Sequence, residues 1–155
     1  HDTVDKVNAG FATEVTRAAV AAVAFMAYPA HSPPTPTPGP ETNMELILNQ
    51  TQFTPGDFFR LDVAYWNQSV EAVDAVMAVI LEIDGRFWFY PSWSGSVDYQ
   101  PMYFPADLDR SEETIVEFVW PESTLHNDNA RFWGFLMTPD LSAVIGEVDQ
   151  IMWRF

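Results

Sequence analysis

The stretch Phe58-Phe59-Arg60-Leu61-Asp62-Val63-Ala64-Tyr65-Trp66 decides the fold class of this chain. Apolar side chains occupy every second position from Phe59 to Tyr65, and Arg60 and Asp62 stand between them. A period of two is that of a β-strand with one face in the core and the other in water. The sequence therefore predicts a half-buried strand here.

Similar short apolar runs, broken by turn residues, fill the chain after Asn43. Asp84-Gly85 between two runs is a strong signal for a two-residue hairpin, and Pro55-Gly56-Asp57 marks another turn. The predicted strands cover residues 44–50, 58–66, 73–83, 86–92, 99–104, 113–120, 130–138 and 143–154. This pattern predicts a mainly β fold, an antiparallel two-sheet sandwich of immunoglobulin-like type, with a closed barrel as the alternative.

An α-helix is expected before the β-rich part. Residues 3–28 contain no proline, Asp2 or Thr3 can cap the start, and Pro29 ends the helix. From Ala18 onward the polar side disappears, so this end has to be surrounded. Apolar residues three or four positions apart form one narrow stripe, the predicted assembly interface: Val4, Val7, Phe11, Val15, Ala18, Ala22 and Phe25.

A proline-rich spacer joins this helix to the β-rich part. Residues Tyr28–Pro40 hold six of the twelve prolines, and such a stretch favours extended polyproline II. We therefore divide the chain into an N-terminal helix (1–28), a Pro/Thr-rich linker (29–43) and a β-sandwich domain (44–155). The helix either packs onto its own domain or packs between several copies. A compact domain rarely needs such a spacer for its own core helix, which favours packing between copies.

Charge and composition exclude several functions. The net charge is −15, and residues 44–155 carry five arginines against eighteen acidic residues. Such a surface repels phosphate backbones and anionic lipid, so we expect no nucleic-acid partner. No cysteine is present, which excludes disulfides and thiolate metal sites. No apolar stretch reaches the roughly 20 residues that a membrane span requires.

The sequence offers no reaction centre, so we expect no enzyme, no cofactor and no metal. His1, His31 and His126 have no partner at a metal-binding spacing. A copper site at His1, as in the copper-dependent polysaccharide oxygenases, is a third hypothesis for function. The acids in 107–109 and 112–113 are interpreted as a solvated turn, with calcium binding as the alternative.

Two glycosylation sequons occur in the β-rich part. They are Asn49-Gln50-Thr51 and Asn67-Gln68-Ser69. Both permit a glycan in a host that attaches one, and such sequons also arise often by chance.

Aromatic residues, 15% of the chain, are the most abundant candidate binding groups. In a strand over 86–92, Phe87 and Phe89 share one face, and Trp88 and Tyr90 share the other. One set should fill the core. The second is available as a stacking platform for sugar rings or as a subunit contact, unless both faces are internal. The candidate platform consists of Trp88, Tyr90, Trp93, Tyr99 and Tyr103.

The string Asn49-Gln50-Thr51-Gln52-Phe53-Thr54-Pro55-Gly56-Asp57, followed by Leu61-Asp62-Val63, resembles the opening of immunoglobulin-like modules in secreted bacterial proteins. Those modules often follow Pro/Thr linkers, and Trp88–Trp93 is similar to their central hairpin. The resemblance implies a sandwich fold and an extracellular or cell-surface location, and it brings no catalytic residue. The layout of helix plus β-domain also resembles pilin-type subunits, although Glu14 sits one residue off the usual processed-pilin spacing.

Together these features predict a secreted structural subunit. Its N-terminal helix would self-assemble into a filament or other homo-oligomer, with a β-sandwich displayed outside. The alternative is a carbohydrate-binding or cell-adhesion module that uses the aromatic platform. The expected partners are further copies of the chain and, in the alternative, a polysaccharide.

Overall fold

A computed structural model describes residues 40–122 and 125–155 of the chain. The chain divides into two units, His1–Thr37 and Pro38–Phe155, and the described residues belong to the second. The expected helix of residues 1–28 and the linker up to residue 39 lie outside the described residues. The described part contains no helix of the length and apolarity that a membrane span needs.

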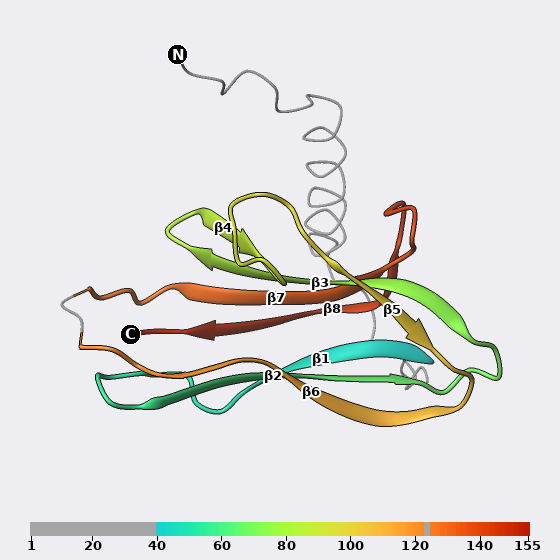
Figure 1. Cartoon of the computed structure of the whole chain (residues 1–155), viewed down its shortest axis with the longest axis horizontal. Helices are drawn as coiled ribbons and strands as arrows, with labels where there is room; N and C mark the ends of the chain where they lie inside the picture. Colours follow the sequence, from blue (N-terminus) through green and yellow to red (C-terminus); the bar gives the residue numbers. More distant parts are fainter. Residues whose placement is uncertain (1–39, 123–124) are drawn as a thin grey trace, which may run out of the picture. The chain divides into compact units, whose positions relative to one another are not determined.

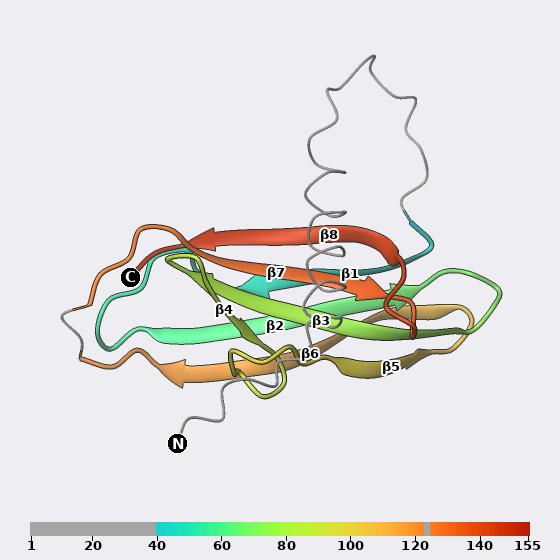
Figure 2. The ribbon, with the colours of Figure 1, turned by 90° about the horizontal axis from the view of Figure 1, so that it is seen from above.

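Within the described residues the regular elements are eight β-strands in two antiparallel sheets, packed as two layers (Figures 1 and 2). The strands are β1 (Thr42–Leu48), β2 (Phe58–Asn67), β3 (Val73–Ile83), β4 (Arg86–Phe89), β5 (Gln100–Phe104), β6 (Leu108–Val119), β7 (Ala130–Met137) and β8 (Val144–Trp153). One sheet has the order β1-β2-β6 and the other the order β4-β3-β7-β8. β5 pairs with the same edge of β3 as β4 does, but at the start of β3 rather than at its end. The prediction of a mainly β, two-sheet antiparallel sandwich is confirmed, and the strand order is compatible with an immunoglobulin-like fold.

Most strand boundaries follow the sequence pattern. β3 begins at Val73 and ends at Ile83, as predicted, and Asp84 and Gly85 both have positive φ in the hairpin turn that follows. The prediction for β6 was wrong at its start, because the strand begins at Leu108 rather than at residue 113. Leu108 pairs with Asn67 across a β-bulge, so Asp109, Glu112 and Glu113 are strand residues, whereas Asp107 lies in the turn before β6.

The core lies between the two sheets. Leu61 and Val63 of β2 are fully buried, as are Met77 and Val79 of β3, and all belong to one hydrophobic cluster. Burying an aliphatic side chain of this size contributes roughly 1.5–3 kcal/mol. Gly134 of β7 lets the sheets approach closely, because a Cβ there would lie 2.8 Å from Leu46 of β1.

Aromatic rings fill one end of this core. Phe59 of β2 lies 5.3 Å from Trp153 and 6.1 Å from Phe132, measured between ring centroids. Phe132 and Trp153 stack at 5.5 Å with an interplanar angle of 11°. Trp120, just after β6, lies 5.6 Å from Trp153 and closes the cluster toward the chain end. Offset and edge-on ring pairs of this kind add to the free energy of burial.

Side chains close the sandwich along the edge where β1 and β8 meet. Asp149 Oδ2 accepts a hydrogen bond from the Leu46 N–H at 2.7 Å, and Asn43 Oδ1 accepts one from the Glu147 N–H at 3.0 Å. These bonds satisfy backbone donors at two sheet edges that no ladder pairs. Gly146 permits the approach: its φ is +73°, and a Cβ would lie 2.6 Å from the Thr42 carbonyl oxygen.

Asn67 fixes the far end of β2. Its side chain is fully buried. Its Nδ2 donates to the carbonyls of Glu71 at 2.8 Å and Pro105 at 2.9 Å, and its Oδ1 accepts from Thr42 Oγ1 at 2.7 Å. A glycan on Nδ2 would remove one of these donors and would need space that the packed core does not leave. In the folded domain the side chain of Asn67 therefore has a structural role and is not accessible for glycosylation.

We expect the substitution Gly146→Ala to lower the free energy of unfolding by about 2 kcal/mol or more, because Ala is strained at positive φ and its Cβ would overlap the Thr42 carbonyl. Urea denaturation would measure the loss. Gly95→Ala is the matched control, since the nearest atom to a Cβ there is 3.9 Å away and no positive φ occurs. An equal loss in both variants would contradict this account of the β1–β8 edge.

Candidate functional site

Three of the five predicted platform residues lie toward the core. Trp88 pairs with Leu81, whose side chain packs against the core cluster, and Tyr90 and Trp93 pack against that cluster as well. The Trp93 ring lies 5.6 Å from Tyr90 and 6.3 Å from Phe132. Trp93 also has φ of +48°, a conformation that costs a bulky residue about 1–3 kcal/mol. Ring packing on the core offsets that cost.

The other platform residues lie elsewhere. Tyr103 of β5 is 66% exposed and pairs with Asp74 on the outer side of the five-stranded sheet. Tyr99 precedes β5 and is half-buried. Phe87 and Phe89 pair with Glu82 and Ile80 and so face outward from the hairpin. The five predicted residues therefore do not share one surface, and their role in binding stays a prediction.

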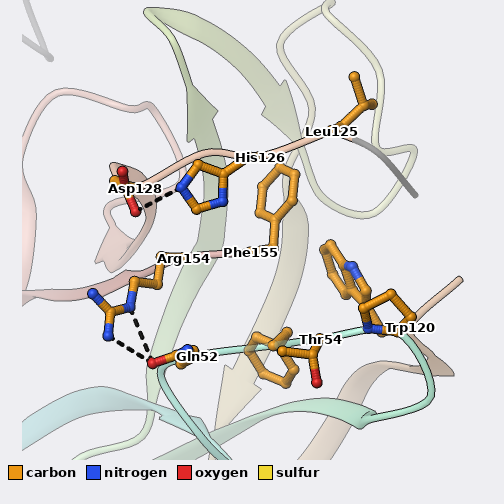
Figure 3. A pocket seen from close by; sticks show the side chains of 10 residues that line it. Gln52, Thr54, Trp120, Leu125, His126, Asp128, Arg154 and Phe155 are labelled. Atoms are coloured by element: carbon orange, nitrogen blue, oxygen red, sulfur yellow. Dashed lines mark hydrogen bonds and ion pairs between the residues drawn. The ribbon is translucent and has the colours of Figure 1, made fainter. Parts of the chain in front are cut away.

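A cleft of about 530 Å³ opens at the end of the sandwich where the aromatic core rings lie. Four segments meet there: the β1–β2 connection, the end of β6, the β6–β7 connection and the end of β8. Sequence reasoning missed this cleft, because no single stretch of the chain carries its pattern. We call it the end cleft (Figure 3).

Rings line one side of the end cleft and polar groups the other (Figure 3). The partly exposed rings of Trp120 and Phe155 are 5.0 Å apart. Arg154 donates from Nε and Nη2 to Gln52 Oε1 at 3.2 and 2.6 Å. His126 Nε2 lies 3.2 Å from Asp128 Oδ1. Rings beside planar hydrogen-bonding groups suit a ligand with an apolar face and several hydroxyls.

Backbone hydrogen bonds hold the walls of the end cleft in place. The Phe53 N–H donates to the Arg154 carbonyl, and the Arg154 N–H donates to the Thr51 carbonyl, both at 3.0 Å. On the other side Asn127 and Phe155 exchange two backbone hydrogen bonds, at 2.7 and 2.9 Å. The end of β8 is thus paired on both sides, so Arg154 and Phe155 project from a fixed backbone.

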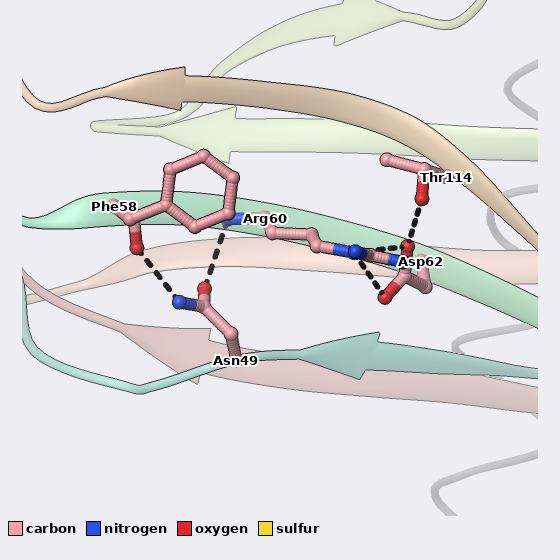
Figure 4. A network of polar contacts seen from close by, with 5 residues as sticks. All are labelled: Asn49, Phe58, Arg60, Asp62 and Thr114. Atoms are coloured by element: carbon pink, nitrogen blue, oxygen red, sulfur yellow. Dashed lines mark hydrogen bonds and ion pairs between the residues drawn. The ribbon is translucent and has the colours of Figure 1, made fainter.

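The outer face of the three-stranded sheet is polar (Figure 4). Arg60 Nε donates to both carboxylate oxygens of Asp62, at 2.9 and 2.8 Å, and Thr114 Oγ1 also donates to Asp62. The hydrogen bonds from Arg60 to Asp62, with the negative charge of Asp62, raise the pKa of Arg60 above its usual value. The exposed side chain of Asn49 donates to the Phe58 carbonyl and accepts from the Arg60 N–H. This is the ordinary water-facing side of an antiparallel sheet.

The outer face of the five-stranded sheet is apolar instead. Val76, Ala78 and Met137 are only 4, 8 and 7% exposed, yet none of them belongs to the core cluster. Their chain neighbours Met77 and Leu136 do belong to it, so the alternation of a strand places the first three on the opposite face. We define the apolar outer face by the residues that pair across its centre: Val76 with Met137, Ala78 with Phe135, and Ile80 with Trp133.

Charged groups border this face at one end. Trp133 Nε1 donates to Glu82 Oε2 at 2.9 Å, and the Arg131 guanidinium lies 5.1 Å from the Trp133 ring centroid. Arg131 Nε is buried and has no hydrogen-bond partner among the described residues. Around the margin lie exposed apolar side chains: Phe87, Tyr103, Val144 and Met152. The exposed apolar side chains of this face therefore lie at its margin, whereas its centre at Val76, Ala78 and Met137 is buried.

The sequence did contain a signal for this second apolar face. Residues 75–81 of β3 and residues 132–137 of β7 are uninterrupted apolar runs, apart from Gly134. Strands that are buried on both faces read in this way, whereas half-buried strands alternate. The predictions above assign strands to both runs and no second buried face.

The described residues contain no group of three or more His, Asp or Glu side chains that could hold a metal ion. His1 and His31 lie outside the described residues.

Comparison with known proteins identifies no family. No family model and no curated protein matches the chain. Similar solved structures include a calcium-binding mutant of Bacteroides uniformis β-glucuronidase 2 (TM-score 0.41, 12% identity, 72% of this chain and 12% of that one). A second is the sporulation control protein Spo0M from Bacillus subtilis (TM-score 0.39, 11% identity, 74% of this chain and 48% of that one). A third is the Pseudomonas fluorescens alkylpurine DNA glycosylase AlkC bound to DNA with an abasic-site analogue (TM-score 0.39, 10% identity, 92% of this chain and 36% of that one).

This chain spans less than half the length of each of these structures. At TM-scores below 0.5 they carry no argument about function. The surfaces described above therefore have to be interpreted from their own chemistry.

Burial raises the pKa of the Tyr90 phenol above its usual 10.0, and the Glu113 carboxylate adds to the rise. The folded chain thus favours the neutral phenol. Tyr90 contributes stability that is complete below pH 10 and is lost as the pH rises from there toward the raised value. We expect Tyr90→Phe to make the free energy of unfolding fall less steeply above pH 10 than in the unsubstituted chain. Urea denaturation over this range would measure it, and an identical pH dependence would contradict the inward position of Tyr90.

Proposed function

We propose that the chain is a secreted structural subunit, extracellular or on the cell surface. It self-assembles through its N-terminal segment into a filament or other homo-oligomer and displays the sandwich outside. The observation that supports assembly is the contrast between the two outer faces of the sandwich, one polar around Arg60 and Asp62, the other apolar around Ala78 and Phe135. An apolar face outside the core is suited to a protein partner.

The sequence supplies a second surface of the same kind. The stripe from Val4 to Phe25 is apolar along a predicted helix, and its Ala-rich end is apolar on all sides. Apolar surfaces of this kind are matched most simply by further copies of the same chain, because most soluble oligomers are homo-oligomers.

Charge limits where copies can meet. With a net charge of −15, two copies repel each other over most of their surface. The three residue pairs that define the apolar outer face carry no charge; the register partners Glu82 and Arg131 lie at one end of the face, and Asp74 of β3 lies at the other. Contact at this face therefore desolvates few carboxylates. Added salt screens the remaining repulsion, which should favour assembly.

The substitution Ala22→Glu tests the proposal. It places a carboxylate within the stripe, where burying an unpaired charge costs several kcal/mol, so the oligomer should be lost. Size-exclusion chromatography with light scattering on the full chain would measure the mass of each species. Thr13→Glu is the matched control, since Thr13 lies opposite the stripe and should tolerate the same charge. Equal masses for the unsubstituted chain and Ala22→Glu, both monomeric, would refute self-assembly through this stripe.

A second candidate function, binding of a neutral polysaccharide, is favoured by the end cleft. Trp120 and Phe155 provide a surface on which a sugar ring can stack, and Gln52 and Arg154 provide donors and an acceptor for its hydroxyls. The negative surface disfavours acidic glycans. This candidate replaces the platform of Trp88, Tyr90 and Trp93 with a different set of residues.

Arg154→Ala tests the second candidate. Loss of a charged hydrogen-bond donor in the end cleft should weaken glycan binding by about tenfold or more. Titration with cellohexaose, xylohexaose and chitohexaose, followed by tryptophan fluorescence, would measure the affinity. Arg110→Ala is the control, because Arg110 contacts Glu45 and Glu112 and does not line the cleft. Equal affinity in the two variants, or no response of the unsubstituted chain to any of the three sugars, would exclude glycan binding at the cleft.

A further inference from the structure

We infer that Met152, on the outer side of the five-stranded sheet, is a site of reversible oxidation, and that Arg131 holds the sulfoxide that forms there. The oxidant it takes is hydrogen peroxide or another small hydroperoxide. The inference stands apart from the proposed assembly and from the end cleft, because it rests on contacts between side chains of β7 and β8.

Exposure separates Met152 from the other methionines that the structure describes. Met152 is 61% exposed, whereas Met44, Met77 and Met137 are 2, 0 and 7% exposed. The remaining described methionine, Met102, is half-buried and packs against the core cluster. A peroxide has to reach the sulfur of a thioether to react with it, so Met152 is the described methionine that oxidises first.

The strand register places Met152 beside Arg131. The two residues pair directly across β7 and β8, and their chain neighbours Ala130 and Trp153 pair with each other in the core. Alternation therefore puts both Met152 and Arg131 on the outer side of the sheet. Arg131 Nη2 donates to Met152 Sδ at 3.9 Å. This contact is weak, because a thioether sulfur is a poor acceptor.

The guanidinium of Arg131 is held in place and is short of acceptors. It lies 5.1 Å from the centroid of the Trp133 ring, and its Nε is buried with no hydrogen-bond partner among the described residues. The ion pairs of the described residues do not include Arg131. Glu82, its register partner on β3, accepts instead from Trp133 Nε1 at 2.9 Å. Arg131 therefore has donors left for a better acceptor than a thioether.

Oxidation supplies that acceptor. A lone pair of the Met152 sulfur attacks one oxygen of hydrogen peroxide, an S–O bond forms, and the O–O bond breaks. Sulfur loses two electrons, and the hydroxide that leaves takes the proton of the transferred hydroxyl and departs as water. The new oxygen is one bond length from Sδ and so comes within hydrogen-bond reach of Arg131 Nη2. A hydrogen bond from a guanidinium to this oxygen is charge-assisted.

The change is reversible and alters the margin of the apolar outer face. A thiol-dependent methionine sulfoxide reductase restores the thioether: two thiols become a disulfide, and the oxygen leaves as water. While it lasts, the sulfoxide replaces one of the exposed apolar side chains at this margin by a polar one. An apolar partner would lose contact area there.

Peroxide treatment followed by mass spectrometry tests the site. The full chain is exposed to hydrogen peroxide for increasing times and digested, and the oxidised fraction of each methionine is measured. We expect Met152 to oxidise at least about tenfold faster than Met44 and Met77, since the reaction follows access to the sulfur. A rate for Met152 equal to those of the two buried methionines would overturn the inference.

The role of Arg131 needs a second readout, the urea denaturation curve before and after the same brief treatment. We expect the change in the unfolding equilibrium constant on oxidation to differ about fivefold between the unsubstituted chain and Arg131→Leu, with the unsubstituted chain favoured, because only its sulfoxide has a charged donor. Arg86→Leu is the matched control, since Arg86 is an exposed arginine that pairs with Ile83 and not with Met152. Met152→Leu separates the effect of Met152 from that of every other methionine.

Each outcome decides one part of the inference. Arg131→Gln repeats the test with another neutral side chain, and near-UV circular dichroism checks that each variant is folded. A loss in both Arg131 variants, but not in Arg86→Leu, supports the inference. The same response to oxidation in all of them would show that water alone solvates the sulfoxide, which overturns the role of Arg131. A response that persists in Met152→Leu would come from another methionine and overturn the site.

Discussion

The central sheet has to be covered on both sides, and the rest of the molecule depends on that constraint. β3 and β7 carry apolar side chains on both faces: Met77 and Leu136 point into the sandwich, and Val76 and Phe135 point out of it. The three-stranded sheet covers the inner face and supplies the hydrophobic core. The centre of the outer face is buried as well, since Val76 and Ala78 are only 4 and 8% exposed. Exposed apolar side chains remain at its margin, namely Phe87, Tyr103, Val144 and Met152, and the hydrophobic effect favours covering them with a partner.

Some surfaces of the sandwich are unsuited to association because their polar groups already have partners. At the β1–β8 edge, the side chains of Asp149 and Asn43 accept hydrogen bonds from backbone N–H groups. Those N–H groups are therefore not free to pair with a strand of another chain. On the polar outer face, Arg60 and Asp62 already form an ion pair with each other, and this face is the side of the sheet that water can solvate. Two surfaces remain as candidates for association: the exposed margin of the apolar outer face, and the end cleft with its rings and planar polar groups. They call for different partners, a protein element for the first and a small polar ring for the second.

The sequence predicted the sandwich well because period-two alternation and turn residues are local signals. β3 and its Asp84-Gly85 turn fall where the pattern put them. The start of β6 could not be predicted, since Leu108 joins the sheet by pairing with Asn67 far along the chain. Alternation also shows which residues share a face but not which face is inside. Alternation therefore left open whether Trp88 and Tyr90, the candidate platform, are exposed; the register with Leu81 turns Trp88 toward the core, and Tyr90 packs there too.

A strongly acidic chain with one uncharged face balances two opposing terms. Repulsion between copies acts over the whole surface and weakens with salt, whereas burial of the face acts only at contact and changes little with salt. In the proposed assembly, repulsion would keep copies apart at low ionic strength, and the contact term would dominate at higher ionic strength. A partner that covers Arg131 would also have to offer an acceptor to its buried Nε, which has no hydrogen-bond partner among the described residues. The arrangement of charge would then set the orientation of such a partner, and the apolar area its affinity.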